Sequence, residues 1–278
     1  IKKSRGHVMK KKELVVDTLK GMFIGACMLV PGVSGGTIAI ILNVYDKLIS
    51  SVSSFFKDIK GNILTLLTIC GGAVVGITMF SRAILFIVNE YTFTSMYLFL
   101  GAVLGSIPLL LKKAKIKKFS MGVIIYPVLG AIIAFAVELV PKDIFGVTAE
   151  SGLLEYVYIV IAGIVLSIAL VLPGISFSYM LLVLGIYEST LLAVEHMEII
   201  FLFSLVLGIG LGTILSTKIL ELAMKNYPRG TYLLIIGFVL FSIREIFPGM
   251  PKGLDIITCL ITFIIGFGAI FLLSMYSD

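Results

Sequence analysis

The chain has 278 residues, of which 59% are hydrophobic and only 14% are charged. Soluble globular domains are about 45 to 50% apolar and about 25% charged, so this composition excludes an ordinary soluble domain and favours a membrane protein. The formal net charge is +6, and basic residues concentrate in Lys2 to Lys12 and in Lys112 to Lys118. Basic loops beside membrane spans set orientation and contact anionic phospholipids, so nucleic-acid binding is the weaker interpretation.

Long apolar runs predict an all-α polytopic membrane protein. These runs approach or reach the roughly 20 residues that a helix needs to cross about 30 Å of hydrocarbon. They lack the alternating ten-residue segments of a transmembrane barrel. We assign residues 1–13 to a basic N-terminal segment, residues 14–140 to a first repeat and residues 153–276 to a second repeat, all within a single membrane domain.

Residues that could bind metals or form disulfides are scattered along the chain. Cys27, Cys70 and Cys259 each stand alone in an apolar run, and the two histidines, His7 and His196, lie in polar segments. This spacing matches neither a disulfide framework nor a metal-dependent hydrolase motif. We therefore expect no metal, no cofactor, no catalytic residues and no enzymatic activity.

Two copies of one motif define the repeat. Pro31-Gly32-Val33-Ser34 leads to Leu42-Asn43-Val44-Tyr45-Asp46, and Pro173-Gly174-Ile175-Ser176 leads to Leu184-Gly185-Ile186-Tyr187-Glu188. The similarity resumes downstream, where Gly72 and Gly76 match Gly208 and Gly212, small-residue pairs that predict close helix packing. Each copy therefore predicts a broken apolar hairpin followed by three helices. The predicted helices are residues 62–89, 93–111 and 119–140, then 199–225, 231–247 and 254–276.

The basic loops predict how these segments are inserted. If residues 14–56 turn back at Pro31-Gly32, the lysines of Lys2 to Lys20, of Lys57 to Lys60 and of Lys112 to Lys118 all face the cytoplasm. This arrangement obeys the positive-inside rule, whereas a single crossing would place Lys112 to Lys118 outside. A hairpin followed by three crossings changes sides an odd number of times. The second copy is therefore expected to be inverted, with one re-entrant hairpin entering from each face.

Each predicted hairpin tip has features of an anion site. Proline and glycine should end one helix there and start another. The unpaired N–H groups at the new helix start suit a phosphate or a carboxylate. The candidate ligands are Ser34, Gly35, Gly36 and Thr37 at the first tip, and Ser176 and Ser178 at the second. Ser34 and Ser176 could instead only cap the helices.

Four charged residues at equivalent repeat positions complete the candidate site. Arg82 and Lys218 lie well inside long apolar helices, where each could balance an anion or could extend to the membrane interface. Asp46 and Glu188 end the matched motif. They could titrate and couple transport to protons or sodium ions, or they could lie in water at helix ends.

The two tip motifs, with Gly35-Gly36-Thr37 after the first, resemble those of the bacterial polyprenyl-phosphate transporters, a family formerly catalogued as a domain of unknown function. The likeness spans nearly the whole chain. It implies a flippase that returns undecaprenyl phosphate from the outer to the inner leaflet of the bacterial cytoplasmic membrane for cell-wall synthesis. Two departures are evident: Cys27-Met28 stands where an Ala-Asp pair is expected, and Phe177-Ser178 stands where Gly-Ser is expected. The first removes an acid that could bind a proton, and the second narrows one tip.

The resemblance also implies partners and leaves alternatives. The expected partners are polyprenyl phosphate and membrane phospholipids, while the coupling ion and assembly into a homo-oligomer stay open. The competing function is ion-coupled secondary transport of a small soluble anion, to which inverted hairpins are equally suited. An intramembrane lipid phosphatase is the weakest alternative, because the predicted spans contain neither a histidine nor a metal constellation.

Overall fold

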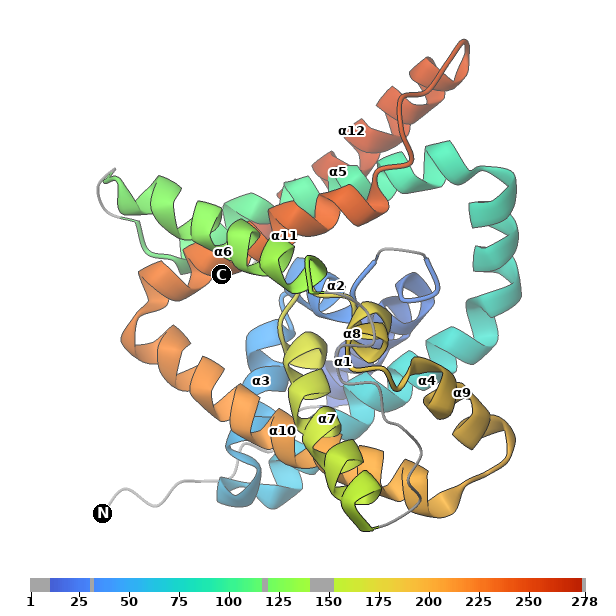
Figure 1. The fold of residues 1–278 in the computed structure, drawn as a ribbon. Helices are drawn as coiled ribbons and strands as arrows, with labels where there is room; N and C mark the ends of the chain where they lie inside the picture. The colour runs from blue at the N-terminus through green and yellow to red at the C-terminus, as the bar shows by residue number, and fades with distance from the viewer. Residues whose placement is uncertain (1–10, 31–32, 117–119, 141–152, 277–278) are drawn as a thin grey trace.

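The computed structural model describes residues 11–30, 33–116, 120–140 and 153–276. Within these ranges the regular structure is entirely helical, which confirms the all-α prediction (Figure 1). In chain order the helices are α1 (Lys11–Cys27), α2 (Gly35–Ile41), α3 (Tyr45–Ser53), a short 3-10 helix (Phe55–Lys57), α4 (Ile59–Glu90), α5 (Thr92–Lys113), α6 (Gly122–Glu138), α7 (Leu153–Val171), α8 (Phe177–Val183), α9 (Tyr187–Glu195), α10 (Ile199–Asn226), α11 (Pro228–Ile246) and α12 (Asp255–Tyr276).

Five of the described helices are long and apolar enough to cross a membrane, namely α4, α5, α7, α10 and α12. The predicted helices after each motif are confirmed, since each coincides within a few residues with α4, α5, α6, α10, α11 or α12. α6 has only 17 residues, somewhat fewer than a typical span. α11 carries three charged residues near its two ends, which lowers its apolar character: Arg229, Arg244 and Glu245.

The two halves of the chain repeat one order of helices. α2 and α8 each have seven residues, and α3 and α9 each have nine. The packing partners are exchanged between the halves, because α5 packs on α12 while its counterpart α11 packs on α6. In Figure 1, α4 and α10 run along opposite sides of the molecule, with α5, α6, α11 and α12 grouped between their far ends.

The segment after the first Pro-Gly break is divided by a helix end at Asn43, which the sequence prediction did not assign. Asn43 has a positive φ of 55° and separates α2 from α3. Its N–H donates to the Ile40 carbonyl oxygen, and the Val44 N–H donates to the Ala39 carbonyl oxygen, both at 2.9 Å. These two bonds form a Schellman motif, which satisfies carbonyl groups at a helix end.

Gly185 ends α8 in the same way, with φ of 66°. The N–H groups of Gly185 and Ile186 donate to the carbonyl oxygens of Leu182 and Leu181, both at 3.1 Å. Asparagine and glycine are the residue types that most readily adopt this left-handed conformation. The repeated Leu-Asn-Val-Tyr and Leu-Gly-Ile-Tyr segments therefore contained the signal for this second break.

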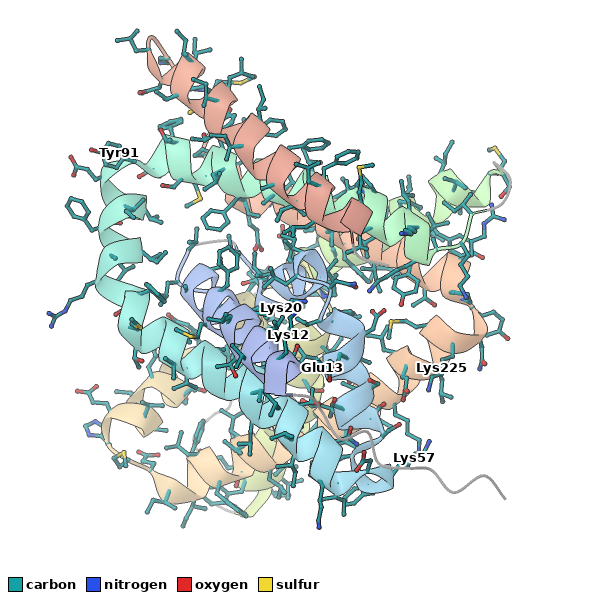
Figure 2. All side chains as sticks on the ribbon, turned by 180° about the vertical axis from the view of Figure 1, so that it is seen from behind. Lys12, Glu13, Lys20, Lys57, Tyr91 and Lys225 are labelled. Atoms are coloured by element: carbon teal, nitrogen blue, oxygen red, sulfur yellow. The ribbon has the colours of Figure 1, made fainter. Side chains whose placement is uncertain are left out.

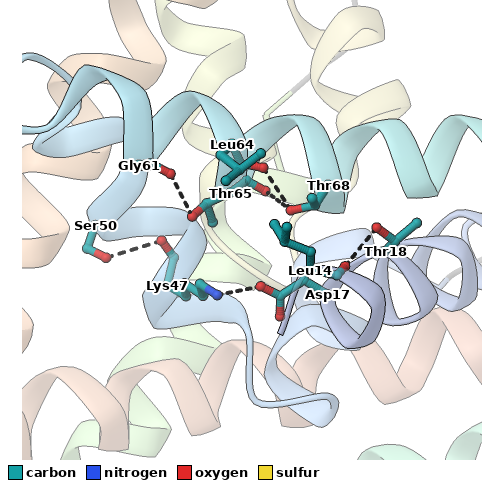
Figure 3. A network of polar contacts seen from close by, with 9 residues as sticks. All are labelled: Leu14, Asp17, Thr18, Lys47, Ser50, Gly61, Leu64, Thr65 and Thr68. Carbon is teal, nitrogen blue, oxygen red and sulfur yellow. Dashed lines mark hydrogen bonds and ion pairs between the residues drawn. The ribbon is translucent and has the colours of Figure 1, made fainter. Parts of the chain in front are cut away.

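The segments on either side of the first break lie together. Asp17 on α1 forms an ion pair with Lys47 on α3, as Figure 3 shows, and the Asp17 side chain is only 8% exposed. α4 packs along α1, where Thr18 and Thr65 turn their hydroxyl groups back to carbonyl oxygens of their own helices. α1, α3 and α4 thus form one packed unit beside the first break.

Basic segments far apart in the sequence meet around α3. Lys113 at the end of α5 contacts Asp46 at the start of α3, and Ser53 at the end of α3 donates to Glu221 on α10. Glu221 is also paired with Lys225 at 2.5 Å. In Figure 2, Lys57 and Lys225 lie far from Tyr91, which ends α4 at the opposite side of the molecule. The basic ends of α5 and α10 therefore share one side of the protein.

Glycines allow the closest helix crossings, as the small-residue pairs predicted. A Cβ atom added at Gly72 on α4 would lie 2.4 Å from the Thr18 carbonyl oxygen of α1. One added at Gly208 on α10 would lie 2.2 Å from the Val160 carbonyl oxygen of α7. Backbones this close leave no room for a methyl group.

Gly72→Ala is expected to destabilise the protein by about 2 kcal/mol or more, because α1 and α4 would have to separate. Gly71 offers a neighbouring control, since nothing lies within 4 Å of an added Cβ atom there. Gly71→Ala should be neutral or should stabilise α4 by up to about 1 kcal/mol. The fraction of monodisperse protein after heating in detergent measures both, and equal heat resistance of the two variants would refute the packing argument.

Candidate functional site

The second Pro-Gly break forms a buried turn between α7 and α8. Gly174 adopts φ of 80°, and an added Cβ atom would lie 2.2 Å from the Phe238 carbonyl oxygen on α11. Only glycine fits both the backbone conformation and the space. Pro31 and Gly32 of the first break lie outside the described residues. The described part of the first break therefore begins at Val33.

The chain brings the two breaks into contact. A Cβ atom added at Gly36, in the first turn of α2, would lie 3.4 Å from the Cα atom of Pro173. Residues from both breaks line one cavity of about 860 Å³, which we call the central cavity. The polar or backbone-exposing residues that line it are Ser34, Gly35, Gly36, Tyr45, Gly174, Ser176, Thr213, Thr217 and Glu245.

The two serines at the breaks differ in their hydrogen bonding. Ser176 caps α8, because its Oγ atom accepts a hydrogen bond of 3.3 Å from the Tyr179 N–H. Ser34 stands at the N-cap position of α2 without a side-chain capping bond. The capping interpretation therefore holds for Ser176, whereas the Ser34 hydroxyl does not cap α2. Ser178 belongs to α8, and its side chain lies outside the described part of the structure.

Two threonine hydroxyl groups near the breaks are buried without a hydrogen-bond partner. Thr37 in the first turn of α2 is only 1% exposed, and its Oγ1 atom is unpaired among the described residues. Thr213 lines the central cavity from α10, and its Oγ1 atom is also buried without a partner among the described residues. Burying a hydroxyl without a partner is costly, so both positions suit a polar ligand. Thr37 was predicted from the first motif, whereas Thr213 lies in an apolar run that gave no signal.

Arg82 and Lys218 lie apart from both breaks. Their side chains are exposed on α4 and α10, and neither lines the central cavity. α4 and α10 are apolar around most of their circumference. Such helices give no sequence signal for which side faces inward, so matching repeat positions could not place these cations at the cavity.

Asp46 is already engaged at the start of α3. Its Oδ2 atom accepts from the Lys113 ammonium at 2.8 Å and from the Tyr232 hydroxyl at 2.9 Å. The Lys113 ammonium also lies 5.9 Å from the centre of the Tyr232 ring. Glu188, the equivalent residue, is exposed in the first turn of α9. Neither carboxylate lines the central cavity.

Asp46→Ala is expected to lower stability by about 1 to 3 kcal/mol, because the Lys113 side chain is only 19% exposed and would lose its carboxylate. Lys113→Ala alone should cost less, and the double variant should recover part of the loss. Heat resistance in detergent of the four proteins gives the coupling between the two residues. Strictly additive losses would show that the ion pair contributes nothing.

Glu245 is the carboxylate that the structure adds to the site. It lines the central cavity from the end of α11, beside Arg244, which pairs with Glu138 of α6 at 2.8 Å. No role was predicted for Glu245 from the sequence. An ionisable residue inside the predicted helix 231–247 was nevertheless a usable signal, since such residues in membrane helices usually serve function.

With this geometry established, comparison with known proteins identifies the family. A family model described as undecaprenyl phosphate translocase-like matches residues 24–258. The chain belongs to the polyprenyl-phosphate transporter family. The matched region includes both breaks and every described residue that lines the central cavity. The family resemblance predicted from the two motifs is thereby confirmed.

Two members of the family resemble the chain along most of their length. The polyprenyl-phosphate transporter of Staphylococcus aureus is 33% identical over 263 residues, which cover 91% of this chain and 93% of the relative. The polyprenyl-phosphate transporter of Vibrio cholerae is 29% identical over 246 residues, covering 83% of this chain and 76% of the relative. No solved structure matches the chain significantly.

Proposed function

We propose that this protein transports polyprenyl phosphate across the membrane, with the phosphate group bound in the central cavity. The observation that carries the proposal is that both Pro-Gly breaks line this one cavity. The two relatives are named polyprenyl-phosphate transporters, which indicates the lipid substrate. The cavity offers a place for the head group of this lipid. Transport rather than chemistry is proposed, since the relatives are named transporters.

The chemistry of the cavity supports a head group inside and a tail outside. Ser34, Gly35 and Gly36 at the start of α2, with Ser176 from the second half, would supply hydroxyl and amide groups for phosphate oxygens. Ser178 in the first turn of α8 stays a candidate ligand. The buried hydroxyl of Thr37 lies in the same turn of α2. Two lining side chains, Val74 and Leu170, are 61% and 48% exposed, so the cavity opens towards an apolar surface. A polyprenyl chain would leave through this opening into lipid.

We further propose that the halves are inverted in the bacterial cytoplasmic membrane, each beginning with a re-entrant hairpin, with the N-terminus in the cytoplasm. The grouping of Lys57, Lys113 and Lys225 around α3 supports a common cytoplasmic side for these residues. Alternating exposure of the central cavity would then return the lipid from the outer to the inner leaflet. In this arrangement Arg82 and Lys218 would meet the head group on the outer surfaces of α4 and α10, before it enters the cavity.

The energy source and assembly belong to the same proposal. Asp46 and Glu188 stay our candidates for coupling to protons or sodium ions, although both lie outside the central cavity. The exposed apolar faces of α4, α10 and α12 would contact membrane phospholipids or a second copy of the chain.

Reconstitution into liposomes tests the proposal. Purified protein should speed the transfer of undecaprenyl phosphate between leaflets, measured by the access of an added phosphatase to the lipid. Liposomes without protein give the background. If the protein instead supports saturable uptake of inorganic phosphate and leaves the lipid in its leaflet, the soluble-anion alternative replaces ours. Release of inorganic phosphate before phosphatase is added would indicate an enzyme.

A further inference from the structure

A second cavity lies beside the central cavity and is also about 860 Å³ in volume. It lies between the ends of α5, α6, α7 and α10 and the first turn of α11. We call it the basic cavity, after two of its lining residues. Its polar lining consists of Lys115, Tyr126, Ser216, Asn226, Tyr227, Arg229 and Thr231.

The charges of the two cavities are opposite. Lys115 and Arg229 line the basic cavity, and none of its described lining residues is a carboxylate. Glu245 lines the central cavity, and none of its described lining residues is a lysine or an arginine. A guanidinium and an ammonium group together match the charge of a phosphate monoester, which is between about −1.5 and −2 at pH 7. Of the two cavities, the basic cavity is therefore electrostatically the better phosphate site.

The walls of the basic cavity suit an apolar chain. Most of the remaining lining residues are aliphatic, among them Ile168, Ile219 and Leu234. Ile168 and Ile219 are 41% and 61% exposed, so the cavity is open to the apolar surface of α7 and α10. A ligand with an anionic head and a long hydrocarbon tail fits this combination, whereas free phosphate would leave the apolar walls uncovered.

The two cavities share a wall. Val171, at the end of α7, lines both of them. On α10, Thr217 faces the central cavity while Ser216 faces the basic cavity. The Tyr45 hydroxyl, which belongs to the central cavity, donates to the Val171 carbonyl oxygen at 2.8 Å. The end of α7 and the neighbouring residues Ser216 and Thr217 of α10 therefore belong to the common wall of the two cavities.

We propose that the basic cavity is a second binding station for polyprenyl phosphate, in which Lys115 and Arg229 hold the phosphate group and the aliphatic wall holds the start of the prenyl chain. Arg229 is positioned for this by a hydrogen bond of 2.5 Å that its guanidinium group donates to the Ser120 Oγ atom. The lipid passes between this station and the central cavity around Val171. The inference rests on the proposed function and adds a second site to it.

The number of lipids bound by the full-length protein tests the inference. We expect native mass spectrometry of the protein in detergent, titrated with undecaprenyl phosphate, to show two bound lipids. Lys115→Gln combined with Arg229→Gln should weaken one of these two sites by at least about tenfold. Lys60→Gln combined with Lys252→Gln removes the same charge at exposed positions outside both cavities and should retain both sites.

A filled cavity gives an independent test that keeps every charge. Ala223→Phe places a ring inside the basic cavity, whereas Leu222→Phe places it on the exposed side of α10. The first variant should lose one bound lipid and the second should keep both. Two lipids on Ala223→Phe, or on the double glutamine variant at unchanged affinity, would overturn the inference.

Competitors separate the inference from the proposed function. Phosphatidylglycerol and inorganic phosphate should leave the second undecaprenyl phosphate in place. Displacement by phosphatidylglycerol would make the basic cavity a general phospholipid site, and displacement by inorganic phosphate would make it a site for the free anion. Either result overturns the second station. One bound lipid that no basic-cavity variant affects would refute the second station alone, whereas no binding to the wild-type protein would refute the proposed function as well.

Discussion

Ser34→Asp is expected to slow polyprenyl-phosphate translocation by roughly two to three orders of magnitude. The carboxylate would face the bound phosphate at the start of α2, and two unit charges about 4 Å apart repel by about 4 kcal/mol at an effective dielectric constant of about 20. Folding should not suffer, because aspartate is as good an N-cap residue as serine. The loss would therefore report on the ligand rather than on the helix.

Ser34→Asn is the matched control for this charge. Asparagine is also a good N-cap residue and is close to aspartate in shape, but it is neutral. It should retain translocation within about tenfold of the wild-type rate, since one neutral hydrogen bond contributes about 1 kcal/mol. Translocation rates of the three proteins in liposomes, at equal reconstituted amounts, give the comparison. Equal rates for the Ser34→Asp and Ser34→Asn variants would show that the phosphate does not bind at the start of α2.

Gly174→Ala is expected to cost about 3 to 5 kcal/mol and to leave little folded protein. Its backbone has φ of 80°, which is unfavourable for alanine by about 1 to 2 kcal/mol. The added methyl group would also lie 2.2 Å from the Phe238 carbonyl oxygen, so the turn would have to move away from α11. The second break and its side of the central cavity would be displaced together.

Gly249→Ala separates backbone strain from crowding. Gly249 has φ of 101°, and nothing lies within 4 Å of an added Cβ atom there. Only the strain of about 1 to 2 kcal/mol should appear at this position. Size-exclusion profiles after heating in detergent should rank wild type first, Gly249→Ala second and Gly174→Ala last. If the two variants lose the same heat resistance, close packing at the second break is not what requires glycine.

Local sequence signals predicted most of the fold. The long apolar runs marked α4, α5, α10 and α12, because a helix must satisfy its own backbone in lipid. The Pro-Gly breaks marked the start of α2 and α8, and their contact through Gly36 and Pro173 agrees with a shared site. The end of α2 at Asn43 was missed, although its repeat equivalent is a glycine.

The distribution of charge around the site could not be predicted in the same way. Lys115 and Arg229 are more than one hundred residues apart and line the same cavity only because α5 ends and α11 begins beside it. Arg82 and Lys218 were matched by the repeat, yet both are exposed and neither lines the central cavity. A repeat fixes equivalence between positions, but only tertiary packing decides which neighbour each position faces.

The Schellman motif at Asn43 also has a mechanical consequence. α2 has seven residues, is about 10 Å long and carries Ser34 at its N-terminal end. Its last five residues are buried, and the two hydrogen bonds at Asn43 satisfy its last carbonyl groups. α3, on the other side of Asn43, is held in place by the ion pairs of Asp46 and Lys47. The start of α2 is therefore held at a fixed angle to an anchored helix, so any movement of the phosphate ligands is expected to carry both helices together.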